Sequence, residues 1–157
     1  MGGRRYGSGR VRIPRMTVAL KRVYAEPSPL DGARVLVDRL WPRGLTKADV
    51  ALDAWLKDLA PSDELRKWFH AHPQQWSKFR ERYLKELSSE AAQEALQQLY
   101  ALEKERRRLT LLFASRNEER NNAVVLKQLV EGDRKPPTGT GPVRAVAAQR
   151  ARAARRR

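Results

Sequence analysis

An apolar run that stops abruptly at a charged pair constrains the fold of this chain more than any other feature. In residues 35–44, three aliphatic side chains are followed directly by Asp38 and Arg39, and Arg43 comes four residues later. Strands that are apolar on both faces are typical of parallel sheets covered by helices, and such sheets bind ligands beyond the carboxyl ends of their strands. We therefore predict a buried strand with these charged residues at its ligand-binding edge. The alternative is that Asp38 and Arg39 form a structural ion pair while Trp41 fills the core.

Two other segments also have the character of strands. Residues 17–24 alternate apolar and polar side chains, which predicts a first strand near an edge of the sheet. Residues 26–32 are expected to form a loop, because they contain two prolines and an Asp-Gly pair. Residues 109–114 form a third apolar run, which is followed by polar residues from Ser115 onward. We interpret this run as a second central strand.

Helical spacing of apolar residues accounts for most of the remaining chain. Thr46 and Asp49 have the spacing of a capping box and predict a short helix, while residues 52–60 fit either its continuation or an irregular crossover. Ser62, which follows a proline, is expected to cap the next helix. Three longer helices follow: one from Pro73 through residue 88, one from residue 88 or 89 to 106, and one from residue 117 or 118 to 131, ended by Gly132.

These elements predict an α/β fold with a small, mostly parallel sheet of three or more strands, covered by about four to five helices. We place it in a single domain, residues 16–133, between flexible basic tails at residues 1–15 and 134–157. Met16 is an alternative start of the protein.

The formal charge of +15 is concentrated at the two ends of the chain. Residues 1–15 carry five arginines, and residues 134–157 carry seven arginines and one lysine, with no acidic residue in either segment. The 20 basic and 18 acidic residues between them leave the domain at +2. Such tails are expected to be disordered and suit the phosphates of nucleic acids. The tail arginines predicted to bind nucleic acid are Arg4, Arg5, Arg10, Arg150, Arg152, Arg155, Arg156 and Arg157.

Composition also limits the classes of site that the chain can hold. It contains no cysteine, which excludes disulfides and thiolate chemistry, and its two histidines cannot by themselves form a histidine-rich metal site. We expect no metal and no cofactor. No apolar run approaches the roughly twenty residues that cross a bilayer, so a soluble, cytoplasmic protein without a membrane partner is expected. His70 and His72 are expected to face solvent or cap a helix, with proton transfer as the alternative.

Two strand-to-helix junctions therefore carry the candidate site. The first holds Asp38, Arg39 and Arg43, and the second contains residues 115–122, with Arg116 among them. If the two strands are parallel neighbours, both junctions meet at one edge of the sheet. The arginines would bind a phosphate or carboxylate, while Asp38 would orient an arginine or act as a general base. For Asn121 and Asn122, helix capping is an equally good interpretation.

Three stretches of this sequence resemble a known family. They are residues 31–45 (Asp-Gly-Ala-Arg-Val-Leu-Val-Asp-Arg-Leu-Trp-Pro-Arg-Gly-Leu), 52–62 and 65–69, and the likeness extends over roughly residues 18–130. In these stretches the chain is similar to the YeaO-like branch of domain of unknown function 488. The resemblance implies a small α/β domain with a site at the Asp-Arg and Trp-Pro-Arg-Gly segments and at the polar turn after the last strand. That turn tends to read His-Asn-His in relatives but Arg120-Asn121-Asn122 here, so only Asn121 carries over.

The leading hypothesis is a YeaO-like domain that binds a small anionic or nucleotide-like ligand at the two junctions, with or without turning it over. The expected ligand-binding residues are Arg39, Trp41, Arg43, Arg116, Asn117 and Asn121, with Asp38 as the catalytic candidate. The alternative is a non-catalytic, nucleic-acid-associated or regulatory protein that acts through its basic tails. No oligomeric state is predicted.

Overall fold

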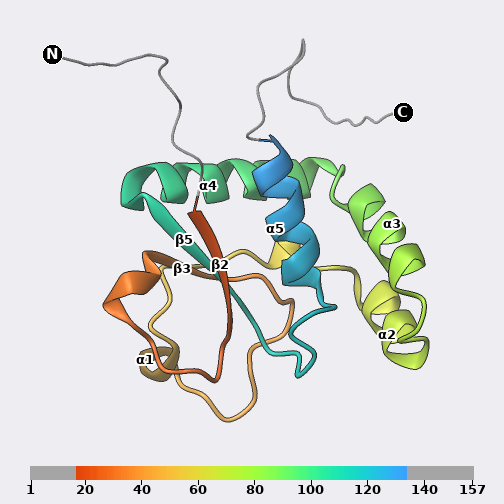
Figure 1. Ribbon diagram of the computed structural model, residues 1–157, viewed down its shortest axis with the longest axis horizontal. Coiled ribbons are helices and arrows are strands. Elements are labelled where there is room, and N and C mark those ends of the chain that lie inside the picture. The colour runs from red at the N-terminus through yellow and green to blue at the C-terminus, as the bar shows by residue number, and fades with distance from the viewer. Residues whose placement is uncertain (1–16, 134–157) are drawn as a thin grey trace, which may run out of the picture.

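A four-stranded, all-parallel sheet forms the centre of the protein in the computed structural model, which describes residues 17–133 (Figure 1). The strands are β2 (Thr17–Arg22), β3 (Ala33–Leu36), β4 (Ala54–Trp55) and β5 (Arg108–Phe113), in the order β2-β5-β3-β4. Each neighbouring pair is parallel. This arrangement confirms the predicted α/β fold and its central strands. The predicted tails and Met16 lie outside the described residues.

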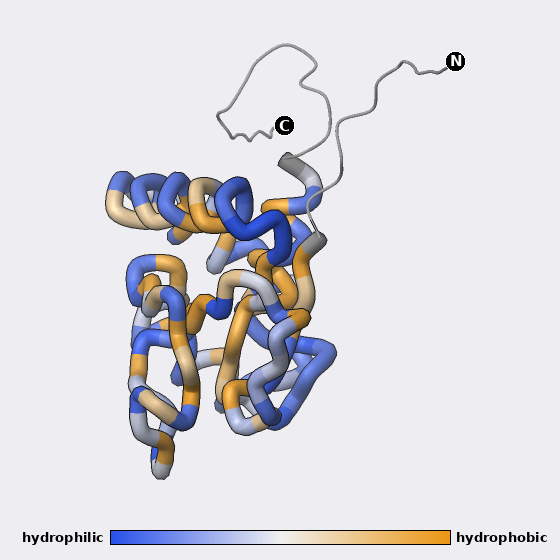
Figure 2. The backbone as a smooth tube through the Cα atoms, turned by 90° about the vertical axis from the view of Figure 1, so that its left-hand side faces the viewer, coloured by the Kyte–Doolittle hydropathy of each residue, from blue (hydrophilic) through white to orange (hydrophobic). Residues whose placement is uncertain are grey.

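Five α-helices accompany the sheet within residues 17–133. They are α1 (Lys47–Val50), α2 (Asp63–Ala71), α3 (Trp76–Glu86), α4 (Glu90–Arg106) and α5 (Asn122–Asp133), with short 3-10 helices at Pro29–Asp31 and Lys57–Leu59. Hydrophilic and hydrophobic stretches alternate along the helices, whereas the central strands are largely hydrophobic (Figure 2). This difference is the pattern expected when helices cover a buried sheet.

The two faces of the sheet are buried in different ways. On one face, alternate strand residues such as Val35, Leu109 and Leu111 join the main core with apolar residues of α2, α3, α4 and α5. On the other face, Leu36 and Leu112 pack in a smaller cluster with residues of the chain between β3 and β4. Both faces are therefore buried, and this burial explains why the strands read as continuous apolar runs.

Helix starts that depend on a local capping pattern are confirmed. The Thr46 hydroxyl accepts a hydrogen bond from the Asp49 N–H, and the Asp49 carboxylate accepts one from the Thr46 N–H. Ser62 caps α2 and Ser89 caps α4, each by accepting a hydrogen bond from a backbone N–H of the first turn. Residues 52–60 form the irregular crossover, with β4 inside it, and not a continuation of the helix.

Four predicted helix boundaries are wrong. Helix α3 ends at Glu86 and not at residue 88. Helix α3 begins at Trp76 and not at Pro73, because the Gln75 N–H donates to the His72 carbonyl in a turn. Helix α5 begins at Asn122, later than predicted. Gly132 does not end α5, which continues to Asp133.

The start of β2 and the end of α5 lie at the same end of the molecule, opposite the carboxyl ends of the strands (Figure 1). Within residues 17–133, no helix is both long enough and apolar enough to cross a membrane.

Candidate functional site

The two predicted junctions meet in a cleft of about 760 Å³ at the carboxyl ends of β3 and β5. The two strands are parallel neighbours, with Leu36 opposite Leu112, so the chain leaves both strands on the same edge of the sheet. The lining includes all seven domain residues predicted for the site: Asp38, Arg39, Trp41, Arg43, Arg116, Asn117 and Asn121. The predicted convergence of the two junctions is therefore confirmed, whereas the ligand contacts of these residues stay predictions.

Asp38 joins the two junctions through its carboxylate. Its Oδ2 atom accepts a 2.8 Å hydrogen bond from the Ala114 N–H, and its Oδ1 atom accepts one of 3.2 Å from the Asn122 side chain. The same Asn122 amide donates to the Val37 carbonyl at 2.8 Å. Burial raises the pKa of Asp38 above its ordinary value of 3.8, and the hydrogen bonds from Ala114 and Asn122 oppose this rise. The carboxylate is thus braced by both loops.

Positive charge dominates the cleft. Of the described residues that line it, five are arginines and one, Asp38, is acidic; the arginines are Arg39, Arg43, Arg66, Arg116 and Arg120. Arg66 forms a 2.5 Å ion pair with Asp63. Among residues 17–133, Arg43, Arg116 and Arg120 form no ion pair with another side chain, and all three are exposed. These three guanidinium groups therefore face no acidic partner among the described side chains.

The alternative interpretation of the first junction was a structural ion pair between Asp38 and Arg39, with Trp41 in the core. Of these two features, the structure contains only the packing of Trp41. Within the described chain, Asp38 and Arg39 form no ion pair; the Arg39 guanidinium instead lies 3.4 Å from the carbonyl oxygens of Ala60 and Pro61. Trp41 does contribute to packing, because its ring meets Trp55 edge-on at 5.3 Å. Trp41 therefore lines the cleft and also supports the smaller core cluster.

Side chains of the loop between β5 and α5 hold that loop in shape. The Asn117 side-chain oxygen accepts hydrogen bonds from the N–H groups of Glu119 and Arg120. The buried Asn121 donates to the Asn117 carbonyl at 2.8 Å and accepts from the Val124 N–H at 3.0 Å. Asn121 thus has the helix-capping contact that was its alternative interpretation, and Arg116 and Arg120 are exposed residues of a loop held by these bonds.

Helix α2 supplies cleft residues that were not predicted as ligand-binding. Arg66, Phe69 and His70 line the cleft from this helix, and Arg120 joins them from the second junction. The positions of Arg66, Phe69 and His70 depend on how α2 packs beside the sheet. No local sequence pattern encodes this packing. His72 lies apart: its ring stacks on Trp68 at 5.0 Å, and its Nδ1 atom is 2.9 Å from the Trp68 carbonyl oxygen.

Known proteins resemble the chain along most of its length. The family model described as the inactive DUF488-N3 subclade matches residues 17–141. The uncharacterised protein YeaO of Escherichia coli (strain K12) is 45% identical over 111 residues, which cover 71% of this chain and 94% of YeaO. An uncharacterised protein of Mycobacterium tuberculosis (strain ATCC 25618 / H37Rv) is 44% identical over 122 residues, which cover 78% of this chain and 98% of that relative. No solved structure matches the chain.

The family model and the two relatives confirm the resemblance found in the sequence. Both relatives are matched over nearly their whole length. The residues that the family model matches include both junctions of the cleft. The chain therefore belongs to the YeaO-like DUF488 family.

Proposed function

We propose that this domain binds a small anionic ligand in the cleft at the carboxyl ends of β3 and β5. The observation that carries the proposal is the charge of the lining, five arginines against the single carboxylate of Asp38 among the described residues. A volume of about 760 Å³ suits a ligand of nucleotide size. Guanidinium groups bind phosphate and carboxylate oxygens through paired N–H donors, so either group suits the cleft.

The proposed role is binding without turnover. Both oxygens of Asp38, the catalytic candidate, already accept hydrogen bonds from Ala114 and Asn122, so this carboxylate acts as a brace in our proposal. The matched family model is described as an inactive subclade, which favours the same conclusion. Arg39, Arg43 and Arg116 would hold the anion, together with Arg120.

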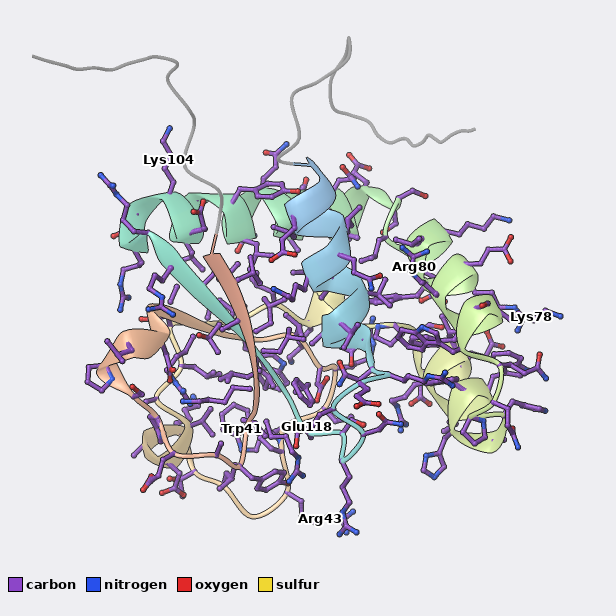
Figure 3. The ribbon with its side chains drawn as sticks, in the orientation of Figure 1. Trp41, Arg43, Lys78, Arg80, Lys104 and Glu118 are labelled. Carbon is purple, nitrogen blue, oxygen red and sulfur yellow. The ribbon has the colours of Figure 1, made fainter. Side chains whose placement is uncertain are left out.

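A matched pair of double variants tests the anion site. Arg116→Gln/Arg120→Gln removes two exposed charges from the cleft, and Lys78→Gln/Lys104→Gln removes two from α3 and α4, outside the cleft. Figure 3 shows Lys104 projecting from α4 at the top and Lys78 from α3 at the right, whereas Trp41 and Arg43 lie in the lower part of the molecule. Both variants change the net charge equally, so they separate a local site from general electrostatic attraction.

Thermal unfolding with added inorganic phosphate or pyrophosphate provides the measurement, because a ligand that binds the folded state raises Tm. The wild type and the lysine variant should show the same rise, and the arginine variant should lose most of it. Equal rises in all three proteins would contradict the proposal, as would no rise in the wild type with either anion.

A second candidate function rests on the charge distribution. The two tails carry 13 of the 15 net positive charges, and this segregation supports binding of nucleic-acid phosphates by the tails. Replacing the tail arginines with glutamine in the full-length chain should weaken binding to a DNA duplex and flatten its salt dependence, because fewer counterions are released. Unchanged affinity and an unchanged salt slope would contradict this role.

A further inference from the structure

Exposed apolar side chains gather at the same cleft as the arginines. Within residues 17–133, three large hydrophobic side chains are strongly exposed: Tyr24 at 43%, Leu40 at 60% and Leu30 at 70%. Tyr24 and Leu40 line the cleft, and Leu30 does not. Single exposed apolar residues are ordinary, but apolar residues that collect around one concave site indicate a binding surface.

Aromatic side chains also line the cleft, and contacts with neighbouring residues hold them in position. Phe69 of α2 stacks on Phe79 of α3 at 4.3 Å, and both side chains line the cleft. In the loop after β3, the indole N–H of Trp41, which also lines the cleft, donates to the Leu45 carbonyl at 2.7 Å. Different parts of the fold therefore supply the rings of the lining in fixed positions, which lowers the entropic cost of binding a flat group against them.

The hydroxyl and the ring of Tyr24 each contact another residue near the cleft. Its hydroxyl donates to the Arg43 carbonyl at 2.9 Å, and the Arg22 guanidinium lies 5.1 Å from the centre of its ring. Arg22 in turn donates to the carbonyls of Ala114 and Ser115, each at 3.0 Å. The exposed tyrosine ring is thus tied to both loops of the cleft.

The distribution of charges in the cleft indicates where the anionic group of a ligand would lie. Asp38 is partly buried and bonded to both loops, whereas Arg43, Arg116 and Arg120 are exposed. An anionic group is repelled by the Asp38 carboxylate and attracted by the exposed arginines, so it is expected to lie on the arginine side. The remainder of the ligand is then left to contact the apolar side chains of the same lining.

We infer that the ligand of this cleft is an amphipathic anion, a phosphate or carboxylate joined to a flat apolar body that packs against Leu40 and the aromatic side chains of the lining. This inference rests on the proposed anion binding and specifies its chemical class. An inorganic anion would leave the apolar lining in water, whereas a ring covers it. We expect a phenyl group to strengthen binding at least about tenfold over a methyl group.

The test compares anions of equal charge on the full-length chain by titration calorimetry. Methyl phosphate and phenyl phosphate form one pair, and acetate and benzoate form the other, so the arms also tell which anionic group is preferred. Leu40→Ser should reduce the advantage of the phenyl probe severalfold and leave the methyl probe unchanged. Leu30→Ser alters a leucine of similar exposure outside the cleft and should change the affinity of neither probe.

The outcomes separate the two proposals. Equal affinity for the phenyl and methyl probes, with binding that Arg116→Gln/Arg120→Gln abolishes, would overturn the amphipathic ligand and leave anion binding intact. An undiminished phenyl advantage in Leu40→Ser would also overturn it. No binding of any of the four probes to the wild type would instead reject the anion site itself.

Discussion

The carboxylate of Asp38 accepts a 2.8 Å hydrogen bond from the backbone N–H of Ala114, which lies 76 residues further along the chain. Asn122 adds a second bond to the same carboxylate and a third to the Val37 carbonyl. One side chain thus connects the loop after β3 with the loop after β5. Because both loops line the cleft, the shape of the cleft depends on this brace.

Replacing Asp38 with alanine should lower the free energy of unfolding by about 1–3 kcal/mol, because it leaves the Ala114 N–H and one Asn122 donor unpaired in a partly buried site. Urea denaturation at neutral pH measures this change. Asp58→Ala, an exposed acidic residue, provides the control and should stay within about 0.5 kcal/mol of the wild type. Equal stability of the two variants would contradict the bracing role.

The pH dependence of stability should reveal the raised pKa of Asp38. Since burial raises this pKa above 3.8, the folded state binds the proton more tightly than the unfolded state. Ionisation of Asp38 therefore costs stability. The wild type should lose stability relative to Asp38→Asn as the pH rises from about 4 through the folded-state pKa. Denaturation curves of both proteins between pH 3 and pH 8 measure the difference.

Asp31 provides a comparison of opposite sign. Burial tends to raise the pKa of its carboxyl, but hydrogen bonds from Lys21, the Ser28 N–H and Arg34 outweigh burial and lower it below 3.8. Its stabilising contribution is complete above the unfolded-state pKa and is lost as the pH falls through the folded-state pKa. The wild type should therefore lose its advantage over Asp31→Asn on acidification. Because the two expected slopes have opposite signs, slopes of the same sign would contradict the assignment for one of the two aspartates.

Gly32→Ala should destabilise the protein severely. Gly32 has φ +67°, and an added Cβ would lie 2.5 Å from both the Cβ and the carbonyl oxygen of Arg108. The left-handed backbone alone costs about 1–3 kcal/mol for a residue with a side chain, and the overlap with β5 adds to this. Gly132→Ala is the matched control, because nothing lies within 4 Å of its added Cβ in α5. It should stabilise the protein by up to about 1 kcal/mol in chemical denaturation.

Arg34→Met should cost about 3–5 kcal/mol of unfolding free energy. The Arg34 side chain is 5% exposed, pairs with Asp31 at 2.5 Å and donates to the Val50 carbonyl at 2.6 Å. Its loss would leave a buried carboxylate without this partner. Arg106→Met breaks a 2.9 Å pair with Asp53 at the surface and should cost less than about 1 kcal/mol. Similar losses in the two variants would show that burial of the pair does not matter.

Local patterns in the sequence were enough to predict most of the elements. Residues 17–24 contain β2, residues 109–114 overlap β5, and the apolar run that starts at residue 35 overlaps the end of β3. In β3 and β5, burial on both faces requires apolar side chains at successive positions. Ser62 and Ser89 marked helix starts correctly, since capping involves only residues within one turn. The start of α5 was missed because Asn117 bonds the N–H groups of Glu119 and Arg120 and delays the helix.

The sequence by itself thus determined the fold class, the central strands and the two polar junctions, because each depends on side chains that are close along the chain. The tertiary structure decided which residues share the cleft. Arg66 and Phe69 reach it only because α2 packs beside the sheet, and Asp38 meets Ala114 only because β3 and β5 are neighbours. Contacts between distant segments depend on how whole elements pack, and a periodic pattern encodes the buried face of an element but not its partner.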